Sequence, residues 1–333
     1  MKGIALVTLA FFITLSGTLS ACSPNESSRP AEPLVVAYSP FESAALLWIA
    51  QDKRFFEHNA LNIALRKYDT GAGSLDAVLN NEADVVLGVK EFPVVRKIPQ
   101  NSNIRIFGVV AKVENQFLVG RKDRGIEKAS DLKGKRVGTT IGTMAEFYLG
   151  RFLEANGMSI KDVSEVDLKT PAEWENAVAD GVVDAIVTAQ PYADLAVKHL
   201  GNNGVIWPVQ GGVYNFGLAA SSDAWLKEHP ELTVRFLKSL SEAEEYARRN
   251  PEEAKAIVQK ELGMDASFIE STWLRSRFSL SLDQTLVTAM EAEARWLISN
   301  NLTTKTQVPN FLDYIVSDGL KTVKPEAVTL VGK

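Results

Sequence analysis

Residues 80–88 read NNEADVVLG, and residues 180–188, a hundred positions later, read DGVVDAIVT. Both stretches have the same order of features: the polar end of a helix, an aspartate, and a short apolar run rich in β-branched residues. Such a run, bounded by polar residues, predicts a buried strand. The repeated pattern indicates two similar structural units in one chain.

Strand-like and helix-like segments alternate around each of these stretches, which predicts βαβ units with parallel strands and covering helices. Around the first stretch we expect strands over 34–39, 61–68 and 84–89 and helices over 42–56 and 72–81. Around the second we expect strands over 135–141, 164–168 and 184–189 and helices over 144–157 and 171–181.

Two β-rich stretches, 103–121 and 204–221, connect the units, and the sequence from about Asp223 onward is helical. Two such connections predict that the chain crosses into a second lobe and then returns to the first. We expect lobe 1 over 34–116 and 214–333 and lobe 2 over 117–213, joined by a hinge around an interlobe cleft.

Residues 1–21 have the layout of a secretory signal peptide, because Lys2 is their only charge and an apolar run follows that ends in small residues. A retained membrane span is the alternative, since a run of this length can just cross a bilayer. The sequence of 19–22, Leu-Ser-Ala-Cys, resembles the bacterial lipobox, whose cysteine is acylated. We expect a signal peptide over 1–21, a lipid anchor at Cys22 and a polar tether over 22–33.

The composition excludes several classes of protein. The formal charge is −5, or −6 without Lys2, and no basic patch indicates nucleic-acid binding. Cys22 is the only cysteine, so the mature chain holds no disulfide and no cysteine-ligated metal. After the signal, no second segment of the sequence has the length and apolarity of a membrane span.

Signals of catalysis are missing. The three histidines, His58, His199 and His229, all lie in polar surroundings that predict exposure. No P-loop, G-x-S-x-G or H-E-x-x-H motif is present. Of the six tryptophans, Trp48, Trp174, Trp273 and Trp296 sit in helical patterns, where core packing is the expected role.

The order of segments resembles the solute-binding proteins of ABC importers, specifically the group that binds nitrate, alkanesulfonates, taurine and thiamine precursors. The resemblance is carried by residues 45–65, 83–95, 131–157, 177–196 and 311–331. It implies a two-lobed periplasmic-binding-protein fold of type II, a small-molecule ligand in the cleft and an ABC permease as the membrane partner. It also implies an exported monomer without catalysis, cofactor or metal, on the periplasmic or extracellular face of the membrane.

Two other functions use the same fold. A ligand-sensing domain would have a signalling partner instead of a permease. A relative of the pyrimidine synthases would be an enzyme with a sacrificial histidine and a cysteine-rich motif, which this sequence lacks.

Ligands of open parallel sheets bind beyond the carboxyl ends of the strands. That rule selects the loops at 39–42, 68–71, 88–92, 139–143 and 188–190 and the return crossing at 214–215. The candidate ligand-binding residues are Ser39, Phe41, Glu42, Asp69, Thr70, Gly71, Lys90, Glu91, Phe92, Thr140, Gly142, Thr143, Gln190, Tyr192, Tyr214 and Asn215.

The chemistry of these loops leaves the charge of the ligand open. The TTIGT stretch, 139–143, precedes a helix and suits an oxyanion such as a sulfonate or carboxylate. Glu42, Asp69 and Glu91 outnumber the single cation Lys90, which favours an amine-bearing or zwitterionic ligand, including heteroaromatic thiamine precursors. The aromatic candidates disfavour an inorganic anion such as nitrate.

Overall fold

The computed structural model describes residues 33–100 and 103–332. The expected signal peptide, Cys22 and the tether up to residue 32 lie outside these residues. The description below concerns the part of the chain from Pro33 onward.

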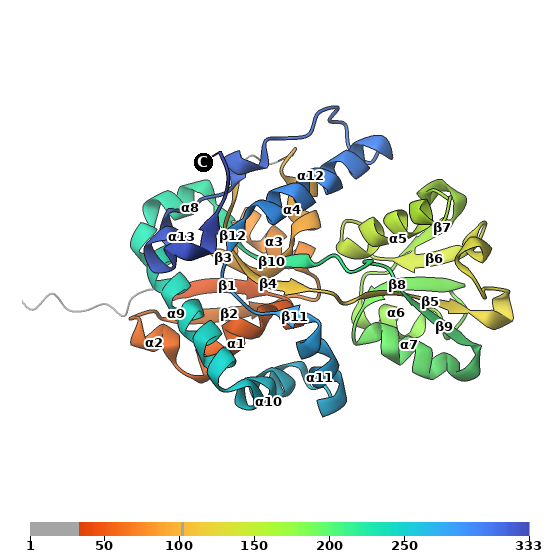
Figure 1. Ribbon diagram of the computed structural model, residues 1–333, viewed down its shortest axis with the longest axis horizontal. Coiled ribbons are helices and arrows are strands. Elements are labelled where there is room, and N and C mark those ends of the chain that lie inside the picture. Colours follow the sequence, from red (N-terminus) through yellow and green to blue (C-terminus); the bar gives the residue numbers. More distant parts are fainter. Residues whose placement is uncertain (1–32, 101–102, 333) are drawn as a thin grey trace, which may run out of the picture. The chain divides into compact units, whose positions relative to one another are not determined.

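A six-stranded sheet has the order β11-β4-β10-β3-β1-β2 (Figure 1). Its strands are β1 (Leu34–Tyr38), β2 (Ile63–Lys67), β3 (Val85–Lys90), β4 (Ile104–Val113), β10 (Asn215–Ser222) and β11 (Ser276–Arg277). Strand β1 pairs in parallel with β2 and β3, whereas β10 runs antiparallel to both β3 and β4. We refer to this sheet and its helices as the first lobe.

A five-stranded sheet has the order β7-β6-β8-β5-β9 and repeats the same plan. Its strands are β5 (Gln116–Arg121), β6 (Arg136–Thr139), β7 (Ser164–Asp167), β8 (Ala185–Ala189) and β9 (Gly204–Pro208). Strand β6 pairs in parallel with β7 and β8, and the incoming strand β5 is antiparallel to β8. With its helices this sheet forms the second lobe. Both sheets therefore have the expected parallel core, but antiparallel strands make them mixed sheets.

The repeated aspartates perform the same task in the two sheets. Asp84 precedes β3, and its carboxylate accepts the backbone N–H of Val35 at 2.7 Å. Asp184 precedes β8, and its carboxylate accepts the backbone N–H of Arg136 at 3.0 Å. Each aspartate also donates its own N–H to the carbonyl of the same partner residue. In each sheet, the repeated aspartate therefore fixes the point at which the two central parallel strands begin to pair.

Helices of the first lobe follow the expected order with two local differences. They are α1 (Ala45–Asp52), α2 (Phe55–His58), α3 (Gly71–Leu79) and α4 (Glu91–Lys97), with a short 3-10 turn over Glu42–Ala44. The single helix expected over 42–56 breaks at Arg54, whose φ of 59° is left-handed. The loop expected over 88–92 is absent, because β3 continues to Lys90 and α4 begins directly at Glu91.

In the second lobe, helices α5 (Met144–Ala155), α6 (Pro171–Asn176) and α7 (Tyr192–Leu200) flank the sheet (Figure 1). Helix α6 starts with a proline in its first turn and a capping box between Thr170 and Glu173. The chain crosses between the sheets at 114–115 and again at 209–214. The lobe boundaries at 116/117 and 213/214 stay predictions.

The last third of the chain is mostly helical, as expected, and packs on the first lobe (Figure 1). Prolines at the first positions of α9 and α10 begin those helices. The elements are α8 (Asp223–Glu228), α9 (Pro230–Arg249), α10 (Pro251–Leu262), α11 (Ala266–Leu274), α12 (Gln284–Ser299) and α13 (Asp318–Val323), with the short strands β12 (Leu282–Asp283) and β13 (Val328–Thr329).

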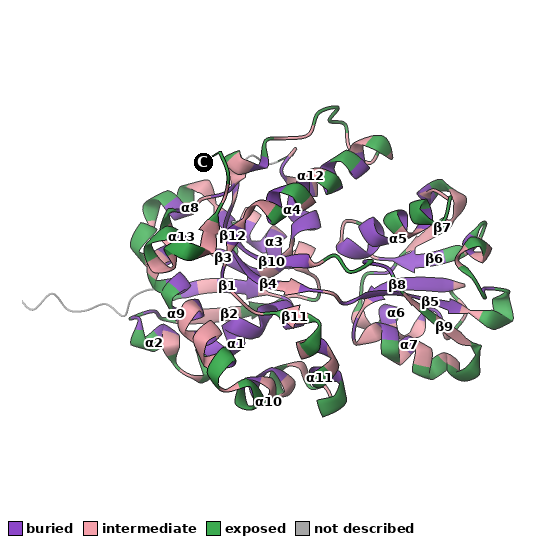
Figure 2. Cartoon of the chain, in the orientation of Figure 1, coloured by how far each residue is buried: buried purple, intermediate pink, exposed green. Residues whose placement is uncertain are grey.

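Buried residues concentrate on the strands and on the helix faces turned toward them (Figure 2). In the first lobe, Phe56 of α2 stacks on Phe236 of α9, with ring centroids 5.6 Å apart. The second lobe has a smaller cluster of its own around Val119, Trp174 and Ile186. Within 33–100 and 103–332, no helix has the combination of length and apolarity that crossing a membrane requires.

Candidate ligand-binding site

A cavity of about 640 Å³, its open mouth included, lies between the two lobes. Residues at or just beyond the carboxyl ends of β1, β3, β6 and β8 meet there, as the rule for parallel strands requires. The lining residues are Ser39, Phe41, Ser43, Thr70, Gly71, Ala72, Gly88, Lys90, Pro93, Asn115, Gln116, Thr140, Thr143, Met144, Ala145, Trp174, Thr188 and Ala189.

Two helices of at least nine residues, one from each lobe, begin at this cavity. Thr70 caps α3 by accepting the N–H of Gly73 at 3.0 Å, and Thr143 caps α5 by accepting the N–H of Ala145 at 3.3 Å. First-turn residues of both helices line the cavity. Their N-terminal dipoles therefore make the cavity favourable for negative charge.

In the part of the chain that the structure describes, Lys90 is the only Lys or Arg that lines the cavity. Its Nζ is buried and has no hydrogen-bond partner among the described residues, although Oε1 of Glu42 lies 3.6 Å away. Burial lowers the pKa of Lys90, and the negative charges of Glu42 and Glu91 only partly oppose this. The ammonium is thus a donor without an acceptor, and an anionic ligand would satisfy it.

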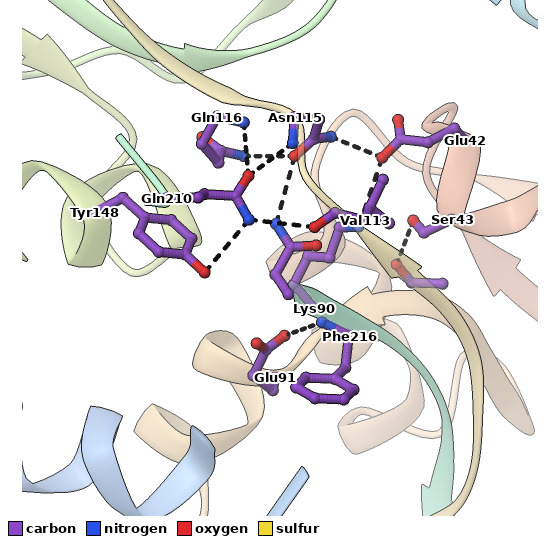
Figure 3. Close-up of polar contacts among 12 residues, drawn as sticks. Glu42, Ser43, Lys90, Glu91, Val113, Asn115, Gln116, Tyr148, Gln210 and Phe216 are labelled. Carbon is purple, nitrogen blue, oxygen red and sulfur yellow. Dashed lines mark hydrogen bonds and ion pairs between the residues drawn. The ribbon is translucent and has the colours of Figure 1, made fainter. Parts of the chain in front are cut away.

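Glu42 is held between Lys90 and Asn115, which both contact its carboxylate (Figure 3). The Asn115 amide Nδ2 donates to Oε1 of Glu42 at 2.7 Å, and the Glu42 side chain is 2% exposed. Asn115 stands in the first crossing between the lobes. The cavity lysine is thereby connected, through Glu42, to the crossing segment.

Gln210, from the second crossing, joins both crossing segments (Figure 3). Its side-chain oxygen accepts the backbone N–H groups of Asn115 and Gln116 at 2.6 and 2.8 Å. Its amide nitrogen donates to the carbonyl oxygens of Val113 and Val213 at 3.2 and 2.8 Å. One side chain therefore satisfies four backbone groups where the two crossings run together.

An apolar wall faces the polar side of the cavity. Phe41 from the first lobe meets Trp174 and Tyr192 of the second lobe, with ring centroids 6.4 and 6.5 Å apart. We expected Trp174 to be a core residue; it is buried, but it also lines the cavity, while its indole N–H donates to the Leu168 carbonyl at 2.9 Å.

Seven of the sixteen candidate residues share the main cavity: Ser39, Phe41, Thr70, Gly71, Lys90, Thr140 and Thr143. Glu42, Gln190 and Tyr192 line a neighbouring cavity that also includes Phe41. Gly142 lies in the turn between Thr140 and Thr143, and its N–H donates to Glu146 at 2.7 Å.

The other five candidates do not line the main cavity. Asp69 is exposed, and Tyr214 lies under the guanidinium of Arg277. Phe92 is fully buried in the core, and Asn215 is fully buried in β10. Glu91 is fully buried as well.

The Glu91 carboxylate, an expected partner for a cationic ligand, instead binds a backbone group of the protein itself. It accepts the N–H of Phe216 at 2.8 Å and is 1% exposed. Burial raises its pKa to about 7, which the Phe216 N–H and Lys90 partly oppose, and Glu293 is a second buried carboxyl nearby. Glu91 is therefore part of the packing around β10.

Sequence reasoning missed several lining residues of two kinds. Met144, Ala145 and Pro93 belong to the first turns of helices, where the sequence shows only apolar periodicity. Asn115 and Gln116 are different, since two amides inside an apolar β-rich stretch are a readable signal of a buried polar site.

The histidines do not contribute to the cavity. His58 and His199 are exposed, as expected, but His229 is half-buried against Trp225, with ring centroids 5.0 Å apart. In the part of the chain that the structure describes, no group of three or more histidine, cysteine or carboxylate side chains is arranged to hold a metal ion.

Comparisons with known proteins place this geometry in a family. A Bacillus subtilis protein named as an aliphatic sulfonates-binding protein is 22% identical over 81% of both chains. The structure of the alkanesulfonate-binding protein SsuA from Xanthomonas axonopodis pv. citri, bound to MOPS, has a TM-score of 0.73 at 19% identity, over 86% of this chain and 98% of that one. The desulfurization enzyme DSZB has the same fold, with a TM-score of 0.62 at 17% identity, over 88% of this chain and 99% of that one.

The matched region includes both lobes. Residues 42–254 match the family described as NMT1/THI5 like. They contain the parallel cores of both sheets except β1, both crossings and most of the cavity lining. The chain belongs to the NMT1/THI5 like family and has the periplasmic-binding-protein fold.

Proposed function

We propose that the protein is the solute-binding component of an ABC importer and captures a small organic anion, such as an alkanesulfonate or an organic carboxylate. The observation that carries the anionic class is the buried Nζ of Lys90, which faces the cavity without a hydrogen-bond partner among the described residues. A charge in that position is costly until it is paired. Glu42, 3.6 Å away, gives Lys90 an opposite charge but no hydrogen bond, and a bound anionic group would supply the missing acceptor.

The rest of the cavity supports the same ligand class. No carboxylate of the described residues lines it, whereas two helix N-termini and several hydroxyl groups do. Phe41 and Trp174 offer apolar surface for the body of the molecule. An amine-bearing heteroaromatic ligand is less well supported, because Glu42 is already bonded to Asn115, Asp69 is exposed and Glu91 is bonded to Phe216.

Relatives that are binding proteins support a receptor, and the cavity lining supports the same choice over an enzyme. Among residues 33–100 and 103–332, no histidine, cysteine or carboxylate that could act as a nucleophile or base lines the cavity. We therefore propose binding without turnover. Formation of a product from a bound compound by the purified protein would contradict this.

The same relatives support export, and we propose a lipid anchor at Cys22 that keeps the receptor near its permease. Acylation with more than one chain would hold it firmly to the membrane. With Cys22→Ser, we expect the protein to move from the membrane fraction to the soluble fraction of the cell. If Cys22→Ser stays in the membrane fraction, the anchor proposal fails while the binding proposal is unaffected.

The ligand class can be tested with a thermal-shift screen of alkanesulfonates, carboxylates, amines and pyrimidines, followed by calorimetry of the compounds that bind. A ligand raises the melting temperature because it binds only the folded state. Lys90→Met should weaken binding of an anionic compound about 10- to 100-fold, the range for a hydrogen bond to a charged group. The matched control is Lys161→Met, an exposed lysine of the second lobe. Equal affinity of Lys90→Met and the wild type would refute the anionic site.

A further inference from the structure

An ion pair joins the two lobes beside the cavity. Arg96 lies in the last turn of α4 in the first lobe, and Glu146 lies in the first turn of α5 in the second. Nη1 of Arg96 is 2.7 Å from Oε2 of Glu146. The Glu146 side chain is 2% exposed, and that of Arg96 is 28% exposed. The pair is thus largely withdrawn from water.

The same carboxylate oxygen holds the turn that lines the cavity. Oε2 of Glu146 accepts the backbone N–H of Gly142 at 2.7 Å. Gly142 has a φ of 86°, and a Cβ built on it would lie 3.9 Å from Nε of Arg96. The guanidinium therefore lies against the turn, whose residues Thr140 and Thr143 line the cavity.

Other bonds that fix this turn come from within the second lobe. The N–H of Ile141 donates to Asp167, and the hydroxyl of Thr143 donates to the carbonyl of Thr140. Arg96 differs from these because it reaches the turn from the first lobe. Its contact is made only while the two lobes are together.

We infer that Arg96 is a positioning residue for ligand binding, acting through Glu146 on the turn 140–143. The inference rests on the proposed binding function. Arg96 does not line the cavity. It couples the contact between the lobes to the shape of the loop that faces the ligand, so that ligand capture and lobe closure favour each other.

The charges around the Arg96–Glu146 pair explain why Arg96 favours the closed form. Glu165 of β7 points a buried oxygen without a hydrogen-bond partner into this region, where it faces Glu146, Arg96 and Asp167. Arg96 is thus the positive charge placed among carboxylates of the second lobe. Without it, closing the lobes would bury Glu146 unpaired, whereas in an open form water would reach that carboxylate. Loss of Arg96 therefore disfavours the closed form.

The experiment compares Arg96→Met, Arg96→Lys and Lys97→Met with the wild type. Lys97 is the matched control, since it neighbours Arg96 on α4 but pairs at 2.6 Å with Asp76 of the same lobe. The probe is 1-butanesulfonate, studied by calorimetry and stopped-flow fluorescence. For Arg96→Met we expect binding weaker by 10- to 100-fold, through a faster dissociation rate and little change in association rate. Arg96→Lys and Lys97→Met should stay within about threefold of the wild type.

A second readout needs no ligand. Spin labels at Lys198→Cys and Lys238→Cys, in a chain that also carries Cys22→Ser, report the distance between α7 of the second lobe and α9 of the first. Arg96→Met should shift the distances of the ligand-free protein toward longer values, and Lys97→Met should not. Glu146→Gln keeps an acceptor for Gly142 but leaves no charge to be buried unpaired, so adding it to Arg96→Met should bring the distances back toward those of the wild type.

The outcomes separate this inference from the binding function. If 1-butanesulfonate and the other screened compounds do not bind the wild type, the proposed function fails, and the label distances still decide the role of Arg96. An unchanged distance distribution together with unchanged affinity in Arg96→Met overturns the inference. Equal weakening by Lys97→Met also overturns it, because the effect would then belong to α4 in general.

Discussion

The contact between Gly150 and Trp296 leads to a prediction whose sign is opposite to that expected from helix propensity. Gly150 lies in the middle of α5, and Trp296 lies on α12 of the other lobe. A Cβ on Gly150 would lie 2.1 Å from Cζ2 of the indole, 2.6 Å from Cε2 and 2.8 Å from Nε1. Real Cβ atoms do not approach rings so closely, so Gly150→Ala requires the ring or the helix to move.

The structure allows the magnitude to be worked out. Replacing glycine by alanine within a helix stabilises it by about 1 kcal/mol. Against this, overpacking of a core costs roughly 1–3 kcal/mol. The upper end applies here, because Trp296 is 3% exposed and packs against Phe92 and Phe147 at centroid distances of 5.9 and 5.5 Å. We expect Gly150→Ala to lower the free energy of unfolding by about 2 kcal/mol.

Thermal and urea unfolding of four proteins tests this reasoning: the wild type, Gly150→Ala, Trp296→Leu and the double variant. For a chain of this size, 2 kcal/mol corresponds to a fall of roughly 3 °C in the melting temperature. With Trp296→Leu the space opens, and Gly150→Ala should then stabilise the protein by up to about 1 kcal/mol. If Gly150→Ala stabilises the protein while Trp296 is intact, the close contact does not constrain α5 and the reasoning is refuted.

Two further predictions concern titration and backbone pairing. Burial raises the pKa of the Glu165 carboxyl to about 7, so the folded state favours its protonated form. This preference stabilises the fold fully below about pH 4, and the stabilisation is lost as the pH rises through 7. Glu165→Gln should remove this loss and, allowing for solvent screening, raise the free energy of unfolding at pH 8 by roughly 1–2 kcal/mol. Urea unfolding at pH 5 and pH 8 measures the effect. Equal pH dependence of stability in the variant and the wild type would contradict the prediction. Asp84→Ala leaves the partly buried N–H of Val35 without its acceptor and should cost about 1–2 kcal/mol in the same assay. A loss below about 0.5 kcal/mol would show that water replaces the carboxylate.

Much of the fold could be predicted because its signals are local. Hydrophobic periodicity and the repeated aspartate give the order of the βαβ segments, and the two connections between them are visible as β-rich stretches. The break at Arg54 could not be foreseen, because a left-handed non-glycine residue depends on how α2 packs against α9. The direct passage from β3 into α4 was not foreseen either, because the rule for parallel strands assigned residues 88–92 to a loop.

The site was predicted less completely, because its chemistry depends on pairings between distant residues. The loops were found from topology, and Lys90 was found as their single cation. Glu42, however, is 73 residues away from the amide of Asn115 that holds it, and Glu91 is 125 residues away from the N–H of Phe216. Counting charges in the loops therefore pointed toward a cationic ligand, whereas the pairings leave only the lysine without an acceptor.

The antiparallel pairing of β4 with β10 has a consequence for how such a chain can be built. Val113, the last residue of β4, stands opposite Asn215, the first residue of β10. The whole second lobe thus occupies the position that a short turn would fill in an ordinary β-hairpin of the first sheet. A two-residue turn in place of 114–214 would close that hairpin and leave every strand of the six-stranded sheet in register. The protein can be regarded as one α/β domain carrying another in a hairpin loop, an arrangement that lets a second lobe be exchanged without rebuilding the first.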